Sequence, residues 1–251
     1  MPFNSSKWRL HQHYSRSSSL RAYLPPTAIL SRKSLARYLS RYRSVYVKPD
    51  REHMGRGVTR VWKEGGRFSI VRVKGKVRRA ASIGDVYRYI RQKSGNSRYI
   101  VQKTIPLAKV NGRRFDIRVM MMRNGSGSWE YAGMLAKVAG KGSIITNVRR
   151  GGGYAVKVGT ALAPFLSASK RDAVQKRLVQ LSYRICRHFD RFKRSSQIGV
   201  DFGVDRTGRI YLIEVNYDYP SHGLFLRLKD KTYYRKIKRL AAAYKRRKRS
   251  R

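Results

Sequence analysis

The stretch that decides the fold is "GVDFGVDRTGRIYLIEVN", residues 199–216, because it gathers three carboxylates in a chain that is poor in them. The 251 residues contain 59 Lys and Arg against 13 Asp and Glu, and Asp201, Asp205 and Glu214 all lie within this stretch. Its two ends, "GVDFGV" and "IYLIEVN", are typical of strands, and "DRTG" between them is typical of a turn. The stretch therefore predicts a β-hairpin.

The pairing within this hairpin decides what its carboxylates can do. If the turn is centred on Thr207 and Gly208, Asp201 lies directly opposite Glu214, with about 5 Å between the Cβ atoms. Asn216 follows Glu214 by two residues, so it projects to the same face. Two carboxylates this close repel each other unless a cation or a proton lies between them. Because Mg²⁺ prefers oxygen ligands, Asp201, Glu214 and Asn216 are predicted to bind it.

Structural roles are also considered for the three carboxylates. The hairpin carboxylates can pair with some of the many lysines and arginines instead of a metal. Asp205 begins the turn, where an aspartate commonly accepts hydrogen bonds from its own backbone, so it is assigned to the turn.

Outside the hairpin, strand patterns recur along the chain. They are "VYVKP" at 45–49, "RFSIVRV" at 67–73, "RYIVQKTIPL" at 98–107, "RRFDIRVMMMR" at 113–123 and "WEYAGMLAKVA" at 129–139. The last two are joined by "NGSGS", which predicts a turn.

Three segments carry helical patterns. In "SRKSLARYLSRYRS", residues 31–44, apolar side chains recur at helical spacing, and "SIGDVYRYIRQ" opens with the capping pair Ser82 and Asp85. A longer helix is predicted from about Ser169, with Ser169 and Asp172 as its capping pair. Its apolar side chains are spaced three or four apart: Val174, Leu178, Leu181, Ile185 and Phe189. Strands and helices mixed in this order predict an α+β fold.

Charge and composition limit the class of protein. The net charge of +46 predicts an anionic partner, which can be nucleic acid, a nucleotide, an acidic protein or a membrane surface. The single Cys186 excludes an internal disulfide and is predicted to lie in the core. No apolar run can span a bilayer and no signal peptide is recognised, so a soluble cytoplasmic protein without a membrane partner is expected. Residues 244–251, "YKRRKRSR", predict a disordered basic tail.

Seven motifs, taken in order, resemble those of ATP-grasp enzymes, and most closely the YheC/YheD group of endospore coat-associated ATP-grasp proteins. They are "SKWRLHQ", "LRAYLPPT", "VYVKPD", "GRGV", "GRRFDIRVMM", "ITNVRRGG" and the hairpin stretch extended to "IGVDFGVDRTGRIYLIEVN". The resemblance covers nearly the whole chain and implies an ATP-grasp fold, in which two α+β subdomains grip a nucleotide. It also implies ATP and Mg²⁺, with two metal ions, and activation of a carboxylate as an acylphosphate that an amine attacks.

A domain division follows from this resemblance. Residues 1–43 are expected to form an N-terminal linker and helical segment, and residues 44–104 the small subdomain with a glycine-rich loop. Residues 105–243 are expected to form the large subdomain with the metal site, and residues 244–251 the basic tail. No room is left before Lys7 for the further domain that precedes the core in many ATP-grasp enzymes.

The resemblance also assigns the residues that bind the nucleotide phosphates. Lys48 and Lys7 match lysines that reach the phosphates, a role that suits a mobile point charge with three donors. Gly55 and Gly57, which flank Arg56, match a loop whose backbone N–H groups approach the phosphates. An ordinary turn would show the same pair of glycines.

A second nucleotide-binding segment is "IVQKTIPL". The resemblance implies that Gln102, Lys103, Thr104 and Ile105 contact the adenine base through their backbone groups. The identity of their side chains is expected to matter little.

The catalytic residues are assigned in the same way. Arg118 matches the arginine near the transferred phosphoryl group, whose developing charge it can stabilise. Asp116 shares its strand face and is placed with the cofactor; alternatively, Asp116 and Arg118 pair with each other. Lys137 stands where relatives carry an arginine and lacks the bidentate fork. Asn147 and Arg149 match the acyl-acceptor side, the alternative being a glycine-rich connection without a ligand.

Beyond Asn216 the resemblance stops, because "YDYPSHG" at 217–223 replaces a short Pro-Gly ending. Substrate choice is therefore expected to depend on this loop. His222 within it is a candidate base, although a loop histidine is more often a bystander. His11 and His13 lack a third ligand nearby, which favours surface residues over a zinc site.

The excess of positive charge indicates the substrate. ATP and Mg²⁺ need a few basic residues, which does not account for +46. An acidic peptide or protein that receives amino acids is therefore expected. The alternatives are a nucleic-acid-binding protein and a structural spore-coat component on an ATP-grasp scaffold, and the resemblance extends the expected location to the spore of a spore-forming bacterium.

Overall fold

The computed structural model describes residues 6–52, 55–73, 75–92, 97–148, 152–217 and 220–249. The chain divides into two units, and each has its own antiparallel sheet. Unit 1 contains Met1–Gln12, Pro25–Ile105 and Ala139–Gly153, and unit 2 contains His13–Leu24, Pro106–Val138 and Tyr154–Arg251. Helix α1 (Lys7–Ser15) includes the point where the chain passes from one unit to the other. The predicted α+β class is confirmed.

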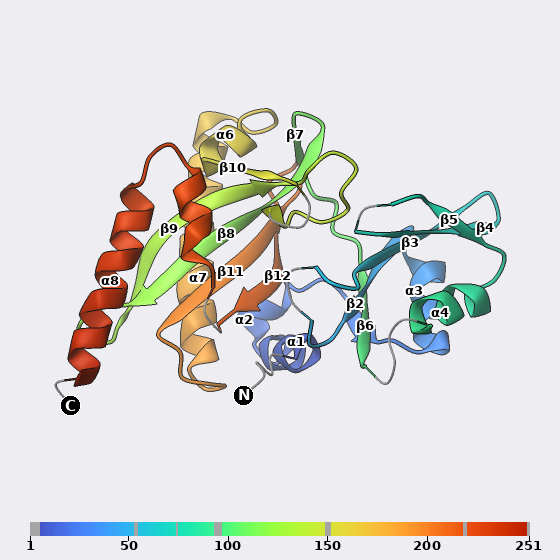
Figure 1. Cartoon of the computed structure of the whole chain (residues 1–251), viewed down its shortest axis with the longest axis horizontal. Coiled ribbons are helices and arrows are strands. Elements are labelled where there is room, and N and C mark those ends of the chain that lie inside the picture. Colours follow the sequence, from blue (N-terminus) through green and yellow to red (C-terminus); the bar gives the residue numbers. More distant parts are fainter. Residues whose placement is uncertain are drawn as a thin grey trace. The chain divides into compact units, whose positions relative to one another are not determined.

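The sheet of unit 1 has the strand order β1-β6-β2-β3-β4-β5 (Figure 1). Its strands are β1 (Thr27–Ile29), β2 (Ser44–Pro49), β3 (Thr59–Glu64), β4 (Arg67–Arg72), β5 (Arg78–Ala80) and β6 (Tyr99–Lys103). Helices α3 (Arg32–Arg41) and α4 (Ile83–Arg91) pack on this sheet. Leu35 of α3 and Val86 of α4 are fully buried against Val45 and Val101 of the strands, which confirms the helical and strand patterns.

The start of α4 confirms the predicted capping pair. The backbone N–H of Asp85 donates to Ser82 Oγ at 3.1 Å, and the backbone N–H of Ser82 donates to Asp85 Oδ2 at 3.2 Å. Two backbone donors that the helix itself leaves unpaired are satisfied in this way.

The sheet of unit 2 has the strand order β10-β9-β8-β11-β12, with β7 paired to β8 (Figure 1). Its strands are β7 (Lys109–Val110), β8 (Arg113–Arg123), β9 (Trp129–Val138), β10 (Tyr154–Val156), β11 (Gln197–Val204) and β12 (Ile210–Asn216). The helical elements of the unit are α2 (Ser18–Arg21), α6 (Val158–Leu162), α7 (Ala168–Phe189), the 3₁₀ helix η1 (His222–Arg227) and α8 (Thr232–Arg249).

The long helix α7 agrees with the predicted apolar spacing but not with the predicted cap. Leu178, Ile185 and Phe189 are among its buried residues, and Cys186 is buried as predicted. The predicted capping pair of Ser169 and Asp172 is wrong: α7 begins at Ala168, its N-cap residue is Ser167, and that side chain makes no capping hydrogen bond. A capping pattern in sequence cannot be distinguished from two polar residues within the first turn.

Helices η1 and α8 cover part of one face of the unit 2 sheet. Met120 and Met122 of β8 pack against Phe225 of η1 and against Ile237 and Leu240 of α8. Because strand side chains alternate, Arg118 shares this face of β8. The helix continues to Arg249, through the residues that the sequence predicts to be a tail. Among the described residues, no helix is long and apolar enough to cross a membrane.

The hairpin of β11 and β12 pairs Asp201 with Glu214, as predicted. The predicted pairing nearer the turn is wrong, because the register shifts after Asp201 and Phe202 pairs with Leu212. Ile213 is the extra residue of this β-bulge. The pairing of the two carboxylates thus depends on a bulge and a wider turn that compensate each other.

The wider turn is organised by Asp205, as predicted. Its Oδ1 accepts hydrogen bonds from the backbone N–H of Thr207 at 2.9 Å and of Arg209 at 3.1 Å. Burial would raise the pKa of Asp205, but hydrogen bonds from Thr207, Arg209 and Tyr211 outweigh it and lower that pKa. Asp205 is therefore a turn residue.

Candidate active site

Four buried charged side chains form a continuous network across three neighbouring strands of unit 2. Arg118 of β8 donates from Nε to Asp201 Oδ1 at 2.5 Å and from Nη2 to Asp201 Oδ2 at 2.8 Å. Lys137 of β9 places its Nζ 3.0 Å from Oδ1 of Asp201 and 3.0 Å from Oδ1 of Asp116. The network therefore runs from Asp116 through Lys137 and Asp201 to Arg118.

Strand register brings these four residues together. Arg118 is directly opposite Asp201 on β11, and Asp116 is directly opposite Lys137 on β9. Residues directly opposite each other project to the same face, and Asp116 and Arg118 share a face because they are two residues apart. Within the described residues, the ion pairs run between strands: Arg118 contacts Asp201 on β11, and Asp116 contacts Lys137 on β9.

Burial makes the pairing in this network energetically important. Burial alone would raise the pKa of Asp201, but the charges and hydrogen bonds of Arg118 and Lys137 outweigh it and lower that pKa to about 2. Burial would lower the pKa of Arg118, but Asp201 outweighs it and raises that pKa. Removal of one partner would leave an uncompensated buried charge, at a cost of about 3–5 kcal/mol.

The predicted metal ligands lie at the Asp201 end of the network. Glu214 is half-buried and directly opposite Asp201. The side-chain amide of Asn216 donates from Nδ2 to Asp201 Oδ2 and to the carbonyl oxygen of Gly199, each at 3.2 Å. The three predicted ligands are thus side by side at the end of one hairpin.

This donor set fits Mg²⁺, with one condition. The 3.2 Å between the Asn216 amide and Asp201 Oδ2 is close to the spacing of about 3 Å between adjacent ligands of an octahedral ion bound at 2.0–2.1 Å. Each oxygen of Asp201 accepts two hydrogen bonds, from Arg118 and Lys137 at Oδ1 and from Arg118 and Asn216 at Oδ2. Asn216 would have to present its amide oxygen instead of its nitrogen. In the described part of the chain, no group of three His, Cys, Asp or Glu could hold a metal, so the amide is essential to this set.

In unit 1, the predicted phosphate-binding lysine is held in a polar row across three strands. Lys48 of β2 donates from Nζ to Gln102 Oε1 at 2.7 Å, and Gln102 Nε2 donates to Thr27 Oγ1 at 2.8 Å. The side chain of Gln102 is buried and makes hydrogen bonds at both ends of its amide. It therefore holds the ammonium group of Lys48 in position. Sequence reasoning missed Thr27 and this use of the Gln102 side chain.

The predicted glycine-rich loop is packed against apolar side chains of the same unit. Gly55 and Gly57 have φ angles of 74° and 67°, which favour glycine. A Cβ on Gly55 would lie 2.4 Å from Ile145 Cδ1, and one on Gly57 would lie 2.7 Å from Pro49 Cγ. Arg56 between them is exposed.

The other predicted residues of unit 1 have less distinctive surroundings. Lys7 begins α1 and donates from Nζ to the backbone carbonyl of Glu52. The backbone N–H groups of Lys103 and Thr104 donate to the carbonyls of Pro26 at 2.9 Å and Ser44 at 3.2 Å. These two N–H groups are thus engaged within the chain.

Three of the predicted residues remain to be placed. Ile105 and Asn147 are half-buried and also belong to unit 1. Arg149 lies outside the described residues.

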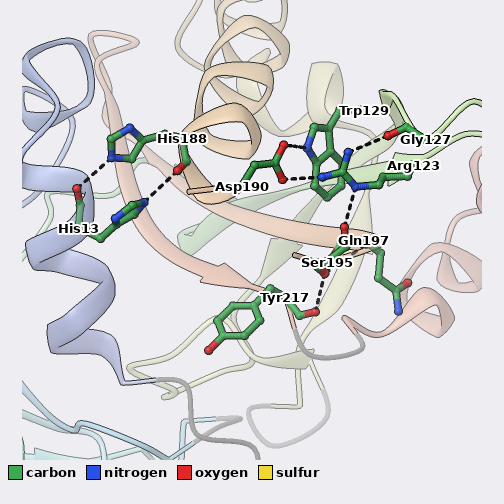
Figure 2. Close-up of polar contacts among 9 residues, drawn as sticks. All are labelled: His13, Arg123, Gly127, Trp129, His188, Asp190, Ser195, Gln197 and Tyr217. Carbon is green, nitrogen blue, oxygen red and sulfur yellow. Dashed lines mark hydrogen bonds and ion pairs between the residues drawn. The ribbon is translucent and has the colours of Figure 1, made fainter. Parts of the chain in front are cut away.

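The histidines contact other residues than the four charged side chains of the network. His11 stacks on Trp8 with 5.7 Å between ring centroids. His13 and His188 each place Nε2 3.0 Å from the other's backbone carbonyl oxygen (Figure 2). His222 Nε2 lies 2.6 Å from Gln197 Oε1, and Gln197 is on the same face of β11 as Asp201.

Comparisons with known proteins place these observations in a family context. The model of the YheC/D-like ATP-grasp family matches residues 2–246. The endospore coat-associated protein YheD of Bacillus subtilis (strain 168) is 26% identical over 229 residues, which are 88% of this chain and 49% of that protein. The chain thus spans about half the length of this curated relative.

A solved structure shows a similar fold. The crystal structure of the D-cycloserine synthetase DcsG matches with a TM-score of 0.58 and 13% sequence identity, over 96% of this chain and 70% of the other. At this identity the likeness concerns the fold alone.

Proposed function

The chain belongs to the YheC/D-like ATP-grasp family, and from that premise we propose that it is an ATP-dependent ligase that joins a carboxylate to an amine. The observation that carries the proposal is the pairing of Asp201 with Glu214 beside the buried Arg118. A buried arginine, two facing carboxylates and an amide are a suitable set for the transfer of a phosphoryl group, which requires positioning and charge stabilisation.

The proposed reaction has two balanced steps. A carboxylate oxygen of the substrate attacks the γ-phosphorus of ATP, the bond from that phosphorus to the β,γ-bridging oxygen breaks, and ADP leaves. An amine then attacks the acyl carbon of the resulting acylphosphate, phosphate leaves with the C–O bond electrons, and the nitrogen releases one proton. The products are an amide, ADP and phosphate.

The residues of unit 2 are assigned to the phosphoryl group. Arg118 stabilises the negative charge that develops on the transferred oxygens. Its two hydrogen bonds to Asp201 hold the guanidinium group in position for this role. Lys137 contacts both Asp116 and Asp201, and its charge contributes to the low pKa of Asp201, the partner that holds Arg118. Bound Mg²⁺ would be held by Asp201, Glu214 and Asn216 and would neutralise phosphate charge.

The residues of unit 1 are assigned to ATP. Lys48 would bind a phosphate oxygen, since Gln102 already orients its ammonium group. Lys7 and the loop of Gly55 and Gly57 remain candidates for the phosphates, and the segment from Gln102 to Ile105 for the base. Asn147 and Arg149 remain candidates for the acceptor.

For the substrate we propose an acidic peptide or protein whose carboxylates receive amino acids. The net charge of +46 supports this choice, because a field of that sign raises the local concentration of a polyanion and its rate of association. For the location we propose the cytoplasm, with association to the spore, in line with the description of the relative YheD as endospore coat-associated.

Mass spectrometry of candidate substrates is the test. The protein is incubated with ATP, Mg²⁺, one amino acid at a time, and either an acidic peptide or a neutral peptide of the same length. The expected result is ADP release together with an adduct whose mass equals the amino acid minus water, on the acidic peptide. Equal rates on both peptides at low salt would contradict the acidic substrate, and no ADP release with any substrate would contradict the ligase.

The name of the relative YheD favours a structural role in the spore coat as the second candidate. A Glu214→Gln variant separates the two roles, because it keeps the size of the side chain and removes a predicted metal ligand. A coat that assembles normally with this variant, together with no adduct from the unaltered protein, would favour the structural role. Equal affinity for random DNA with and without ATP would instead favour nucleic-acid binding.

A further inference from the structure

Gly199 of β11 lies beneath two side chains at once. A Cβ on this residue would lie 3.0 Å from both Cδ and Nη1 of Arg118 and 2.9 Å from Cβ of Pro220. Contacts this short force a neighbour to move, because well-packed carbon atoms are separated by about 3.5–4.0 Å. Arg118 and Pro220 therefore both occupy space that a side chain at position 199 would need.

The backbone at Gly199 does not itself require glycine. Its φ is not positive, in contrast to those of Gly133 in β9 and Gly208 in the turn between β11 and β12. Any residue could adopt this extended conformation, so the reason for glycine at this position is space. The space is used by Arg118, which crosses from β8 to reach Asp201 on β11.

The hydrogen bonds of Arg118 show which of its nitrogens lies in this space. Within the described residues, they are made by Nε and Nη2, both to Asp201. Nη1 carries two further N–H groups, and it is the guanidinium nitrogen that a Cβ at position 199 would approach. A methyl group there would both displace the guanidinium and occupy the space beside the nitrogen that is available to a ligand oxygen.

We propose that Gly199 is a positioning residue, whose missing side chain lets Arg118 reach Asp201 and keeps Nη1 accessible to an oxygen of the transferred phosphoryl group. This role rests on the proposed ligase activity. Pro220, in the middle of the 217–223 loop that is expected to choose the substrate, lies against the same face of Gly199 as Arg118 does. Gly199 thereby connects the substrate loop with the phosphoryl site.

The first experiment compares Gly199→Ala with Gly159→Ala in steady-state ATP turnover. Gly159 lies in α6 with nothing within 4 Å of an added Cβ, so it is a matched control for the same chemical change. We expect kcat of Gly199→Ala to fall by about 10- to 100-fold, the order of effect that a misplacement of about 1 Å produces, with the KM for ATP changed less than threefold. Unchanged kcat in Gly199→Ala would overturn the proposal.

A second measurement does not depend on turnover. In ¹H–¹⁵N spectra, the Nε–H signal of Arg118 is assigned by its disappearance in Arg118→Lys. It is expected to stay in place in Gly159→Ala and to shift or broaden in Gly199→Ala. An unmoved signal in Gly199→Ala would overturn the positioning role even if the protein hydrolyses no ATP, so a failure of the ligase proposal can be told apart from a failure of this one.

A double-mutant cycle covers the case in which Gly199→Ala folds poorly. The loss of Tm caused by Gly199→Ala is measured with Arg118 present and again in Arg118→Ala. If Arg118 is the neighbour that the methyl group displaces, the loss in the second background is expected to be less than half of the first. Equal losses would show that the added methyl conflicts with Pro220 or the strand alone, which would overturn the role for Arg118.

Discussion

Two arginines of β8 each bind an aspartate of a neighbouring segment, and they differ in how the other N–H donors of their guanidinium groups are used. Arg118 places Nε 2.5 Å from Asp201 Oδ1, and Arg123 places Nη2 2.5 Å from Asp190 Oδ1. Arg123 also donates from Nε to the carbonyl of Ser195 at 2.9 Å and from Nη1 to the carbonyl of Gly127 at 2.7 Å (Figure 2).

Satisfied donors distinguish a structural arginine from a functional one in this sheet. All three nitrogens of Arg123 are engaged, and its guanidinium carbon lies 4.3 Å from the ring centroid of Trp129. Arg123 therefore ties the end of the β8–β9 hairpin to the segment after α7. Arg118 is more deeply buried but directs its hydrogen bonds to one partner, which leaves donor capacity for a ligand.

The largest expected effect comes from Arg118→Lys. Lysine keeps the charge but loses the planar fork, so we expect ATP turnover to fall by about 10²–10³-fold in kcat. Arg123→Lys is the matched control, since the same exchange there is expected to change kcat less than threefold. Equal losses in the two variants would break the distinction between the two arginines. Steady-state ADP release measures both.

The next effect concerns stability. Arg123→Ala removes three hydrogen bonds of a charged group, so we expect the free energy of unfolding to fall by about 2–3 kcal/mol, while kcat/KM stays within threefold. Urea unfolding and ADP release are measured on the same preparation. A variant of unchanged stability would show that the contacts around Arg123 do not hold the hairpin.

A smaller effect is expected from Trp129→Phe. The exchange keeps an aromatic ring under Arg123 but removes the indole N–H that donates to Asp190 Oδ2 at 3.0 Å. We expect a loss of about 1 kcal/mol in urea unfolding, because Asp190 is partly exposed and water can replace the donor. A loss as large as that of Arg123→Ala would show that the indole hydrogen bond to Asp190 ties the hairpin as strongly as the guanidinium hydrogen bonds do.

The smallest expected effect is a pH dependence of the stability, which arises at the contact between His13 and His188 (Figure 2). Since carbonyl oxygens accept, His13 and His188 both carry a proton on Nε2 and donate from it. Burial lowers the pKa of His13, its hydrogen bond with His188 raises it, and the charges of His188, Arg16 and Arg191 lower it further, with a net lowering.

Below a pH of about 6.5 the unfolded chain therefore binds more protons at this site than the folded protein does. The stability that neutral His13 contributes is present above pH 6.5 and is lost as the pH falls toward 5. His13→Gln keeps a donor at the same position and does not titrate, so we expect its Tm to fall less between pH 7 and pH 5. Identical pH profiles would show that His13 does not titrate differently in the two states.

Much of the fold could be predicted from sequence because its signals are local. The alternation of "FDIRVMM" predicts that Asp116 and Arg118 share a face, and Ser82 and Asp85 cap α4 within four residues. The same local logic failed at Ser169 and Asp172, since a cap is defined by where the helix begins. It also missed the bulge after Asp201, because an extra residue in a strand leaves no mark in a short apolar alternation.

The sequence by itself determined the hairpin and the family, because these depend on residues close together or on the order of motifs. It also predicted that Asp201 pairs with Glu214, but without the bulge on which that pairing depends. The tertiary structure decided which cations bind Asp201. Arg118 is 83 residues away along the chain, and 59 lysines and arginines are candidates for that contact. It also decided why position 199 is a glycine, since the space for Arg118 and Pro220 exists only after the strands have paired.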